Sequence, residues 1–560
     1  MALSGGTVMG MVVAGLGVCG LTTLFFAYTV LFGDATMREL HRAMNVLAGF
    51  SLGASSIALF ARVGGGIYAE AAGTGAGVVG TVEAGIPEGD PRNPAVIAGM
   101  VGDNVGGVAG MGADLFESYV GSIVGAMVLG VAYDSVNLVI LPLLLAGLGI
   151  AVSIAGTRAV RAEEGGNPQR ALNRGSVAAG VLMLVLTYPL VKWLVPRAVT
   201  PVENVTGTLH VVSAGGIALA TMSGLLAGIA VGVAIAHYTT EARQRQGAGQ
   251  SLTGAATTVL GDLGLGLLAT AWPVIFLAAA IVLAFYLAGL YGIAMAGLGM
   301  LSTIGIQLAV DAYGSIAGTA ADIAEMSELG PEVQRRSDVL AALDNGSAAI
   351  GKGLAIGSAA LTALALFSAY QSVAGIRSVD VGDPYVMAGM LFGAMLPFLF
   401  GAMVLRAVGG AASEMVEEVR RQFRSLPGPV EDRARADCTR CVDTAAAAAI
   451  RRLLVPGIMA VVTPVAVGLL DEHALGGMLA GVIVSGVPLA IFMGNAGGAW
   501  RNGGTYIEGG QFGGPGSDAQ TAVAAGDTVG DPFKDAVGPS LNTLIKLMSV
   551  VALVLASLLA

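Results

Sequence analysis

The chain has 560 residues, of which 55% are hydrophobic and only 12% are charged, and its mean hydropathy is +0.78. Soluble domains carry about 25% charged residues, so this composition excludes an ordinary soluble protein and indicates an integral membrane protein. The net charge of −10 lies in short loops and on a few helices and indicates no nucleic-acid partner. The 85 glycines indicate closely packed helices, because small residues let helix backbones approach one another in lipid.

Apolar segments long enough to cross a bilayer follow one another along the chain. The first, 7–32, is expected to be a permanent helix because no cleavable signal peptide is evident. At roughly 20 residues per crossing, we predict about 13 transmembrane helices in one all-α domain over 1–560, with 409–450 as a cytoplasmic loop with helix extensions. The expected helices are 7–32, 46–69, 95–127, 134–156, 175–195, 209–238, 260–286, 288–318, 346–372, 384–408, 452–471, 475–499 and 537–559.

Arginine is concentrated in every second loop of this arrangement. The positive-inside rule places the basic loops in the cytoplasm. We therefore expect a multi-pass protein of the cell (inner) membrane with a cytoplasmic N-terminus and an external C-terminus. The basic loop residues are Arg158, Arg161, Arg170, Arg174, Arg243, Arg245, Arg335, Arg336, Arg420, Arg421, Arg424, Arg433, Arg435 and Arg440.

Cysteine and histidine give little indication of a metal or redox site. The three cysteines are too few for a disulfide framework. Cys438 and Cys441 form a lone CxxC in the charged loop, which could be a redox or metal pair. Without a second pair or nearby histidines, we favour two ordinary loop cysteines. The scattered histidines are His41, His210, His237 and His473.

Three apolar stretches carry charged residues. Arg62 interrupts the stretch SIALFARVGGGIYAE. Two further stretches carry polar and small residues at spacings of three and four, which places them on one helix face. These residues are Asp103, Gly107, Gly110, Asp114, Glu117 and Ser118 in the first of the two, and Asp527, Asp531, Asp535, Asn542 and Lys546 in the second.

Burying a charged side chain inside a membrane is energetically unfavourable. A bare charge at the membrane centre costs at least about 2.5–3.5 kcal/mol, so such groups persist where they are paired or hydrated. A buried cluster of opposite charges, with a serine and an asparagine nearby, suits a cation path or a proton relay. The alternative is a structural ion-pair network that only holds helices together. We favour the functional interpretation, which is the default for intramembrane ionisable residues.

These segments resemble the membrane-bound pyrophosphatases, a family of proton- or sodium-pumping enzymes driven by pyrophosphate hydrolysis. Matching stretches recur from about residue 40 to the C-terminus and include ALFARVGGGIY, VEAGIPEGDPRNPAVIA, NVGGVAGMGADLFESYVGSIVGAMVLG, DAYGSIAGTAADIAEM, VSGVPLAIFMGNAGGAW and GDTVGDPFKDAVGPSLNTLIKLMSVVAL. Members typically have about sixteen helices, so this chain is expected to begin at the fourth and to keep the inner ring of six.

The resemblance implies helices in concentric inner and outer rings, a homodimer in the lipid bilayer, and a cytoplasmic pyrophosphate funnel above an ion gate. The gate matches the family residue by residue. Its expected members are Arg62, Asp114, Glu117, Ser118, Asn542 and Lys546.

The funnel departs from the family pattern. Eight positions that hold carboxylates in the family, and four that hold lysines, carry other residues here. The former carboxylate positions are Gly73, Gly77, Gly89, Gly99, Gly107, Gly318, Ala341 and Arg501, and the former lysine positions are Glu70, Thr81, Gly504 and Thr505. The polar residues that remain as a vestibule or residual metal site are Asp103, Asn104, Asp338, Asn345, Asn502, Asp527, Asp531, Lys534 and Asp535.

Pyrophosphate hydrolysis depends on the groups that the funnel has lost. Magnesium requires near-octahedral oxygen ligation, and hydrolysis needs carboxylates that position and activate a water. Glycine supplies neither ligand nor charge, and Glu70 and Arg501 reverse the sign of charge at two positions. We therefore predict no intact catalytic residue, no meaningful pyrophosphatase activity and no certain cofactor, with residual magnesium as a possibility.

The favoured hypothesis is a non-hydrolytic proton or sodium transporter, or a channel, on a pyrophosphatase scaffold. Its funnel would have become a less charged vestibule while the gate was kept; simple decay of an unused site is the other interpretation. One alternative is a pyrophosphate-energised pump that retains magnesium-dependent hydrolysis. Another is a regulatory or structural pseudoenzyme subunit.

Overall fold

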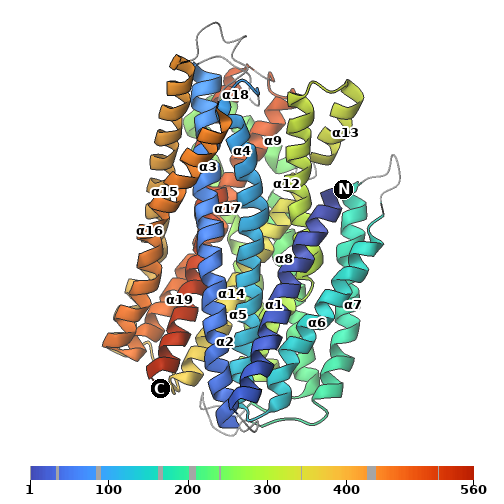
Figure 1. The fold of residues 1–560 in the computed structure, drawn as a ribbon, viewed down its shortest axis with the longest axis vertical. Coiled ribbons are helices and arrows are strands. Elements are labelled where there is room, and N and C mark those ends of the chain that lie inside the picture. Colours follow the sequence, from blue (N-terminus) through green and yellow to red (C-terminus); the bar gives the residue numbers. More distant parts are fainter. Residues whose placement is uncertain are drawn as a thin grey trace.

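The computed structural model describes residues 2–32, 37–83, 90–161, 168–200, 210–238, 241–341, 344–425, 437–514 and 516–559. Within these ranges the chain is almost entirely helical, and the pairing of extended segments is confined to one isolated bridge between Val199 and Val212. The long helices stand side by side along the long axis of the molecule (Figure 1). The prediction of an all-α protein is confirmed.

The helices vary widely in length. Those of the first half are α1 (Ala2–Phe32), α2 (Met37–Ala58), α3 (Gly65–Gly75), α4 (Pro94–Asn104), α5 (Met111–Ala132), α6 (Val136–Ala159), α7 (Pro168–Leu194), α8 (Ala214–Tyr238), α9 (Glu241–Gln250) and α10 (Ala255–Ala269). Those of the second half are α11 (Ala271–Met300), α12 (Ile304–Met326), α13 (Pro331–Ala341), α14 (Asp344–Val373), α15 (Pro384–Ser425), α16 (Cys438–Leu470), α17 (Glu472–Glu508), α18 (Asp518–Asp531) and α19 (Gly538–Leu559).

Twelve helical segments within the described ranges are long and apolar enough to cross a membrane, against the predicted number of about 13. The difference arises at Ala255–Met300, which forms one continuous apolar segment but changes direction inside α11. Ala288 and Gly289 leave the helical conformation there, and Gly289 has φ +61°. A Cβ on Gly292 would lie 2.2 Å from the Ala284 carbonyl oxygen, so the two halves of α11 run side by side.

The predicted helix at 288–318 is wrong in one respect. The chain does start a new helical run after the reversal at Gly289, but that run ends at Met300. A turn at 301–303 separates it from α12. The two pieces were predicted as one because both are apolar and glycine-rich.

Some membrane helices are enclosed by others. The most apolar stretches of Pro94–Ala132 and Gly351–Val373 are 89% buried, and that of Asp518–Leu558 is 78% buried. The corresponding stretches of Gln169–Leu194 and Cys438–Leu470 are only 28% buried. Helices α5, α14 and α19 therefore form the centre of the bundle, while α7 and α16 lie at its periphery.

Glycines set the distance between packed helices. On α15, a Cβ at Gly389 or Gly393 would lie 2.1 or 2.0 Å from a carbonyl oxygen of α17. On α17, a Cβ at Gly477 or Gly481 would lie 2.2 Å from a carbonyl oxygen of α15. Each helix therefore presents two glycines four residues apart to the backbone of the other, which is the close contact that small residues allow between membrane helices.

Four π-helical segments interrupt the α-helices within the described ranges: η1 (Leu59–Gly64), η2 (Ala76–Glu83), η3 (Val105–Gly110) and η6 (Pro532–Val537). Single π-helical turns inside α-helices are frequent at functional sites. Here η1 carries Arg62, η3 directly precedes α5, and η6 carries Lys534 and Asp535. Three of the four segments, η1, η3 and η6, thus lie in the charged stretches that the sequence singled out.

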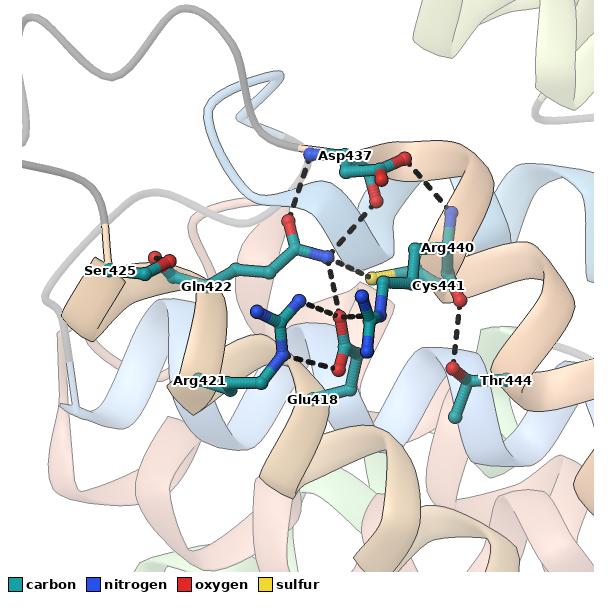
Figure 2. A network of polar contacts seen from close by, with 8 residues as sticks. All are labelled: Glu418, Arg421, Gln422, Ser425, Asp437, Arg440, Cys441 and Thr444. Atoms are coloured by element: carbon teal, nitrogen blue, oxygen red, sulfur yellow. Dashed lines mark hydrogen bonds and ion pairs between the residues drawn. The ribbon is translucent and has the colours of Figure 1, made fainter.

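A polar network fastens the end of α15 to the beginning of α16 (Figure 2). The Gln422 side chain donates to Glu418 Oε1 at 2.9 Å and to the Asp437 carbonyl at 3.0 Å, and it contacts Cys441 Sγ at 3.6 Å. Arg421 donates to both Glu418 oxygens at 2.9 and 2.6 Å. Cys441 is buried in the hydrophobic core, so it acts here as a packing residue beside the network.

Candidate ion gate and vestibule

The centre of the bundle holds a buried cluster around Lys546. This lysine lies on α19, and its ammonium nitrogen is 2.8 Å from the Asp114 carbonyl oxygen and 2.9 Å from Ser118 Oγ. It also contacts Asp114 Oδ1 and lies 3.0 Å from Glu117 Oε2. The side chains of Lys546, Asp114 and Glu117 are 0%, 1% and 1% exposed. The predicted gate residues on α5 and α19 therefore meet in a site enclosed by protein.

A second layer of hydroxyl groups surrounds this cluster. Thr362 on α14 donates to the Ser118 carbonyl at 3.2 Å and shares a 2.7 Å hydrogen bond with Ser122. The Ser55 side chain of α2 lies beside the Glu117 carboxylate. Asn542 sits one turn before Lys546 on α19 and is 2% exposed, and its Oδ1 accepts no hydrogen bond from the described residues. The cluster thus contains side chains from α2, α5, α14 and α19, and many of its polar atoms are oxygens of the kind that bind small cations.

The charges of the cluster balance only when the nearby Arg62 is counted. Two carboxylates contact one ammonium group, and Arg62, which forms no ion pair within the described ranges, supplies a second buried positive charge that interacts with Asp114. A buried uncompensated charge is strongly unfavourable. Within contact distance the acids therefore outnumber the base by one, and the compensating charge is the more distant Arg62.

Arg62 lies near the cluster without pairing with it. Its guanidinium donates to the Gly106 carbonyl at 2.7 Å, which links η1 to η3. Arg62 is 4% exposed, and Gly110 packs against its Cδ, where a Cβ would lie 3.3 Å away. Within the described ranges it forms no ion pair with a carboxylate. That Arg62 belongs to the gate stays a prediction, and its hydrogen-bond partner in the structure is a backbone carbonyl of η3.

Three of the remaining vestibule acids, Asp527, Asp531 and Asp535, are paired with cations of the chain itself. Lys534 Nζ lies 3.1 Å from Asp531 Oδ1 and 3.0 Å from Asp535 Oδ2. Lys352 on α14 donates to Asp535 Oδ1 at 2.9 Å. Arg501 on α17 lies 3.8 Å from Asp527 and 3.9 Å from Asp531. The pairs form a continuous chain from α17 through α18 and η6 to α14.

The acid that precedes α4 follows the same pattern. Asp90 accepts hydrogen bonds from Arg92 Nε at 2.8 and 3.0 Å and from Arg92 Nη2 at 2.5 Å. These bonds hold the pKa of Asp90 below its usual value. On α3, the buried Glu70 lies near Asp531, Asp535 and Lys534. It stands where the resemblance implies a lysine, so it adds another acid beside the network.

Several positions at which the resemblance implies carboxylates face open space. A Cβ at Gly73, Gly77, Gly99 or Gly318 would meet no neighbouring atom within 4 Å. Gly107, another of these positions, is more crowded, because a Cβ there would lie 2.4 Å from Ser315 Oγ. At Gly504, where the resemblance implies a lysine, a Cβ would lie 3.4 Å from a Val523 methyl. Four of these glycines therefore have room beside them for a larger side chain.

The other predicted vestibule residues make no ion pair within the described ranges, although Asp103 is close enough to Asp535, Arg501 and Lys534 to interact with their charges. Asp103 is exposed, and Asn104 donates to Thr319 Oγ1 at 2.7 Å. Asn502 is buried, and Thr505 donates to the Arg501 carbonyl at 3.1 Å. Gly89 lies outside the described residues, as do the side chains of Thr81, Asp338, Ala341 and Asn345.

Magnesium fits the described vestibule poorly. Magnesium requires several oxygen ligands in near-octahedral geometry. No three histidine, cysteine, aspartate or glutamate side chains within the described ranges gather as a metal-binding group. Asp531 and Asp535 already contact Lys534, and a metal would have to displace that ammonium group.

Two contributors were missed by the sequence interpretation. Lys352 is the only charged residue in the apolar stretch AAIGKGLAIGSAAL, and that isolation was a usable signal. Its partner Asp535 is 183 residues away in the chain, so the pairing itself left no local pattern. Thr362 gave no signal, because a threonine in an apolar helix is ordinary.

Comparison with known proteins identifies the family to which the chain belongs. Residues 1–555 match the family model described as "Inorganic H+ pyrophosphatase". The chain is 50% identical to the "Putative K(+)-stimulated pyrophosphate-energized sodium pump" of Clostridium tetani, over 99% of this chain and 80% of that protein. It is 44% identical to the "K(+)-insensitive pyrophosphate-energized proton pump 2" of Moorella thermoacetica, over 100% of this chain and 82% of that protein. The chain therefore belongs to the inorganic H+ pyrophosphatase family and is a multi-pass membrane protein.

Proposed function

We propose that this protein moves protons or sodium ions across the membrane without hydrolysing pyrophosphate. The ion passes the buried cluster of Asp114 and Glu117, and Lys546 closes the path by pairing with both acids. Arg62 and Asn542 flank this path. Without hydrolysis, transport is passive or coupled to another solute.

The charge balance of the gate supports transport of a cation. Within contact distance the cluster carries one more acid than base, while Arg62 lies farther away, and α2, α5, α14 and α19 all contribute side chains to it. A site of this kind favours a single added positive charge, which is what a proton or a sodium ion supplies. Either ion weakens the attraction between Lys546 and Glu117, so that binding and opening are linked.

The observation that carries the loss of hydrolysis is the self-pairing of the vestibule. Arg501, where the family has an aspartate, lies within 4 Å of two acids that remain, Asp527 and Asp531. Lys534 and Lys352 neutralise Asp535 in the same way. Acids held by the chain's own cations are poor magnesium ligands, and without magnesium the charge of pyrophosphate is unscreened.

Ion flux into proteoliposomes tests the proposal. Sodium uptake and pH-dye signals should rise in vesicles with the wild-type protein, and Glu117→Gln should lower the flux at least about tenfold because it removes the charge that holds the ion. The exposed Glu472→Gln is the matched control and should leave the flux unchanged. Absence of flux in the wild type, or equal flux in Glu117→Gln, rejects the proposal.

The second candidate is a pump that retains pyrophosphate hydrolysis. The names of the two relatives at 50% and 44% identity favour it, since each is named as a pyrophosphate-energised pump. Phosphate release from pyrophosphate and magnesium by the purified protein separates the two candidates. We expect no release above background, and clear magnesium-dependent turnover would establish the pump instead.

The role of Arg501 can be tested directly by metal binding. Arg501→Asp should strengthen manganese binding to the vestibule by about tenfold, since it removes a cation near Asp527 and Asp531 and adds a ligand. Electron paramagnetic resonance of Mn²⁺ would measure this. Arg336→Asp on α13 is the charge-matched control, because Arg336 pairs with the exposed Glu332 and both side chains lie at the surface. Equal gains in both variants would show a general charge effect and contradict self-pairing at Arg501.

A further inference from the structure

One face of the peripheral helix α7 changes from basic to apolar along its length. Arg170 and Arg174 lie one helical turn apart at its beginning, and the apolar residues follow at intervals of three and four. Together these side chains line a shallow, open surface pocket of ≈ 660 Å³. The lining residues are Arg170, Asn173, Arg174, Val177, Ala178, Val181 and Leu182.

The far end of α7 shows where this face lies in the bilayer. Tyr188 and Trp193 are 49% and 73% exposed there, and exposed aromatic residues of these types mark the membrane–water interface. Trp193 lies nineteen positions after Arg174, and at about 1.5 Å per residue this distance along the helix is about 29 Å. The hydrocarbon core is roughly 30 Å thick, so Arg174 and Arg170 lie at the headgroup level of the opposite leaflet.

The chemistry of the pocket matches both parts of a lipid. Two guanidinium groups at headgroup level suit a phosphate, which arginine binds through paired hydrogen bonds. Asn173 adds an amide, whose Oδ1 accepts from Gln169 at 3.1 Å. The exposed Val177 and Val181 continue below at the depth of the acyl chains. A soluble phosphate ion would use only the upper part of this surface.

We propose that this face of α7 binds an anionic phospholipid of the leaflet that borders the arginine-rich loops. The phosphate lies between Arg170 and Arg174, and one acyl chain follows Val177, Val181 and Leu182. This proposal does not depend on the proposed transport function. It predicts that the protein retains phosphatidylglycerol in preference to phosphatidylcholine.

A second arginine cluster provides an internal comparison. Glu417, Arg420, Arg421, Arg424 and Ser425 line a cavity of ≈ 470 Å³ at the end of α15. Arg424 is forty residues beyond Pro384, or about 60 Å along the helix, so it lies well outside a bilayer entered at Pro384. This cluster has arginines without an apolar surface at acyl depth.

Native mass spectrometry of protein released from phosphatidylcholine–phosphatidylglycerol nanodiscs tests the site. The wild type should keep phosphatidylglycerol, and Arg170→Gln/Arg174→Gln should reduce its retention about 30-fold, because each surface arginine contributes about fivefold to the binding of an anionic lipid. Arg420→Gln/Arg424→Gln removes the same charge and should leave retention unchanged. Arg170→Lys/Arg174→Lys should retain most of the phosphatidylglycerol, and this result would separate a loss of lipid binding from misfolding.

Five outcomes would overturn the proposal. Equal retention of both lipids in the wild type shows a merely apolar surface. Unchanged retention in Arg170→Gln/Arg174→Gln, or an equal loss in the α15 variant, removes the role of these arginines. Displacement of phosphatidylglycerol by millimolar inorganic phosphate shows an anion site without lipid specificity. A change from dimer to monomer in the α7 variant shows that a second copy of the chain occupies the face.

Discussion

Lys546 stabilises two acids that would otherwise be buried without a partner. Removal of one member of a buried ion pair typically costs about 3–5 kcal/mol. We therefore expect Lys546→Met to lower the unfolding free energy by about this amount, and we expect Lys546→Met/Asp114→Asn to be less destabilised than the sum of the single variants. Unfolding in mixed detergent micelles would measure both.

The exposed Lys192 of α7 is the control for this prediction. Its ammonium group donates to the Pro196 carbonyl at 3.1 Å and lies at the surface. Lys192→Met should change stability by no more than about 0.5 kcal/mol, as is usual for surface substitutions. If Lys546→Met is equally mild, the buried cluster is hydrated and the charge argument for the gate is wrong.

Residue chemistry was the part of the site that sequence predicted best. Asp114, Glu117 and Ser118 share a face of one apolar helix, and Lys546 is the cation of another. Because burying an unpaired charge in a membrane is costly, a contact between these side chains could be expected from the sequence. The role of Arg62 was less accessible, because its partner is a carbonyl oxygen exposed by a π-helical turn. Backbone acceptors of this kind leave no trace in the amino-acid pattern.

At the scale of helices, glycine spacing can be tested as a packing device. Gly389→Ala places a methyl group 2.1 Å from the Ala474 carbonyl oxygen, so α15 and α17 must separate. We expect a loss of about 1–3 kcal/mol, the usual effect of overpacking, visible as a lower unfolding temperature. Gly409→Ala on the same helix meets no atom within 4 Å and should be neutral or stabilising. Equal effects of the two substitutions would show that α15 and α17 do not pack so closely.

Helix pairing was harder to predict than helix existence. The GxxxG spacing on α15 and on α17 is visible in the sequence, but nothing local says that the two face each other. The predicted helix at 288–318 failed for a related reason. Hydropathy is uniform across Met300, and only the backbone geometry at 301–303 shows that the chain turns there.

At the scale of the molecule, the two ends of the bundle face opposite sides of the membrane. Helix α18 and the arginine-rich end of α15 lie at one end, and the C-terminus lies at the other (Figure 1). We expect the arginine-rich end to face the cytoplasm. In a background with Cys19, Cys438 and Cys441 changed to serine, an impermeant maleimide should label Asp380→Cys on intact cells. It should label Ser425→Cys only after permeabilisation, and the reverse pattern would invert the topology.

The positive charge of the gate is covalently attached to α19. An ammonium group on a lysine stem can swing between acceptors, but it cannot leave the protein with the ion that it displaces. A voltage step across a membrane containing many copies should therefore move a small, saturating amount of charge even when ions are absent from both solutions. Electrical recording would detect this displacement as a transient current whose integral is the same, with opposite sign, when the voltage returns.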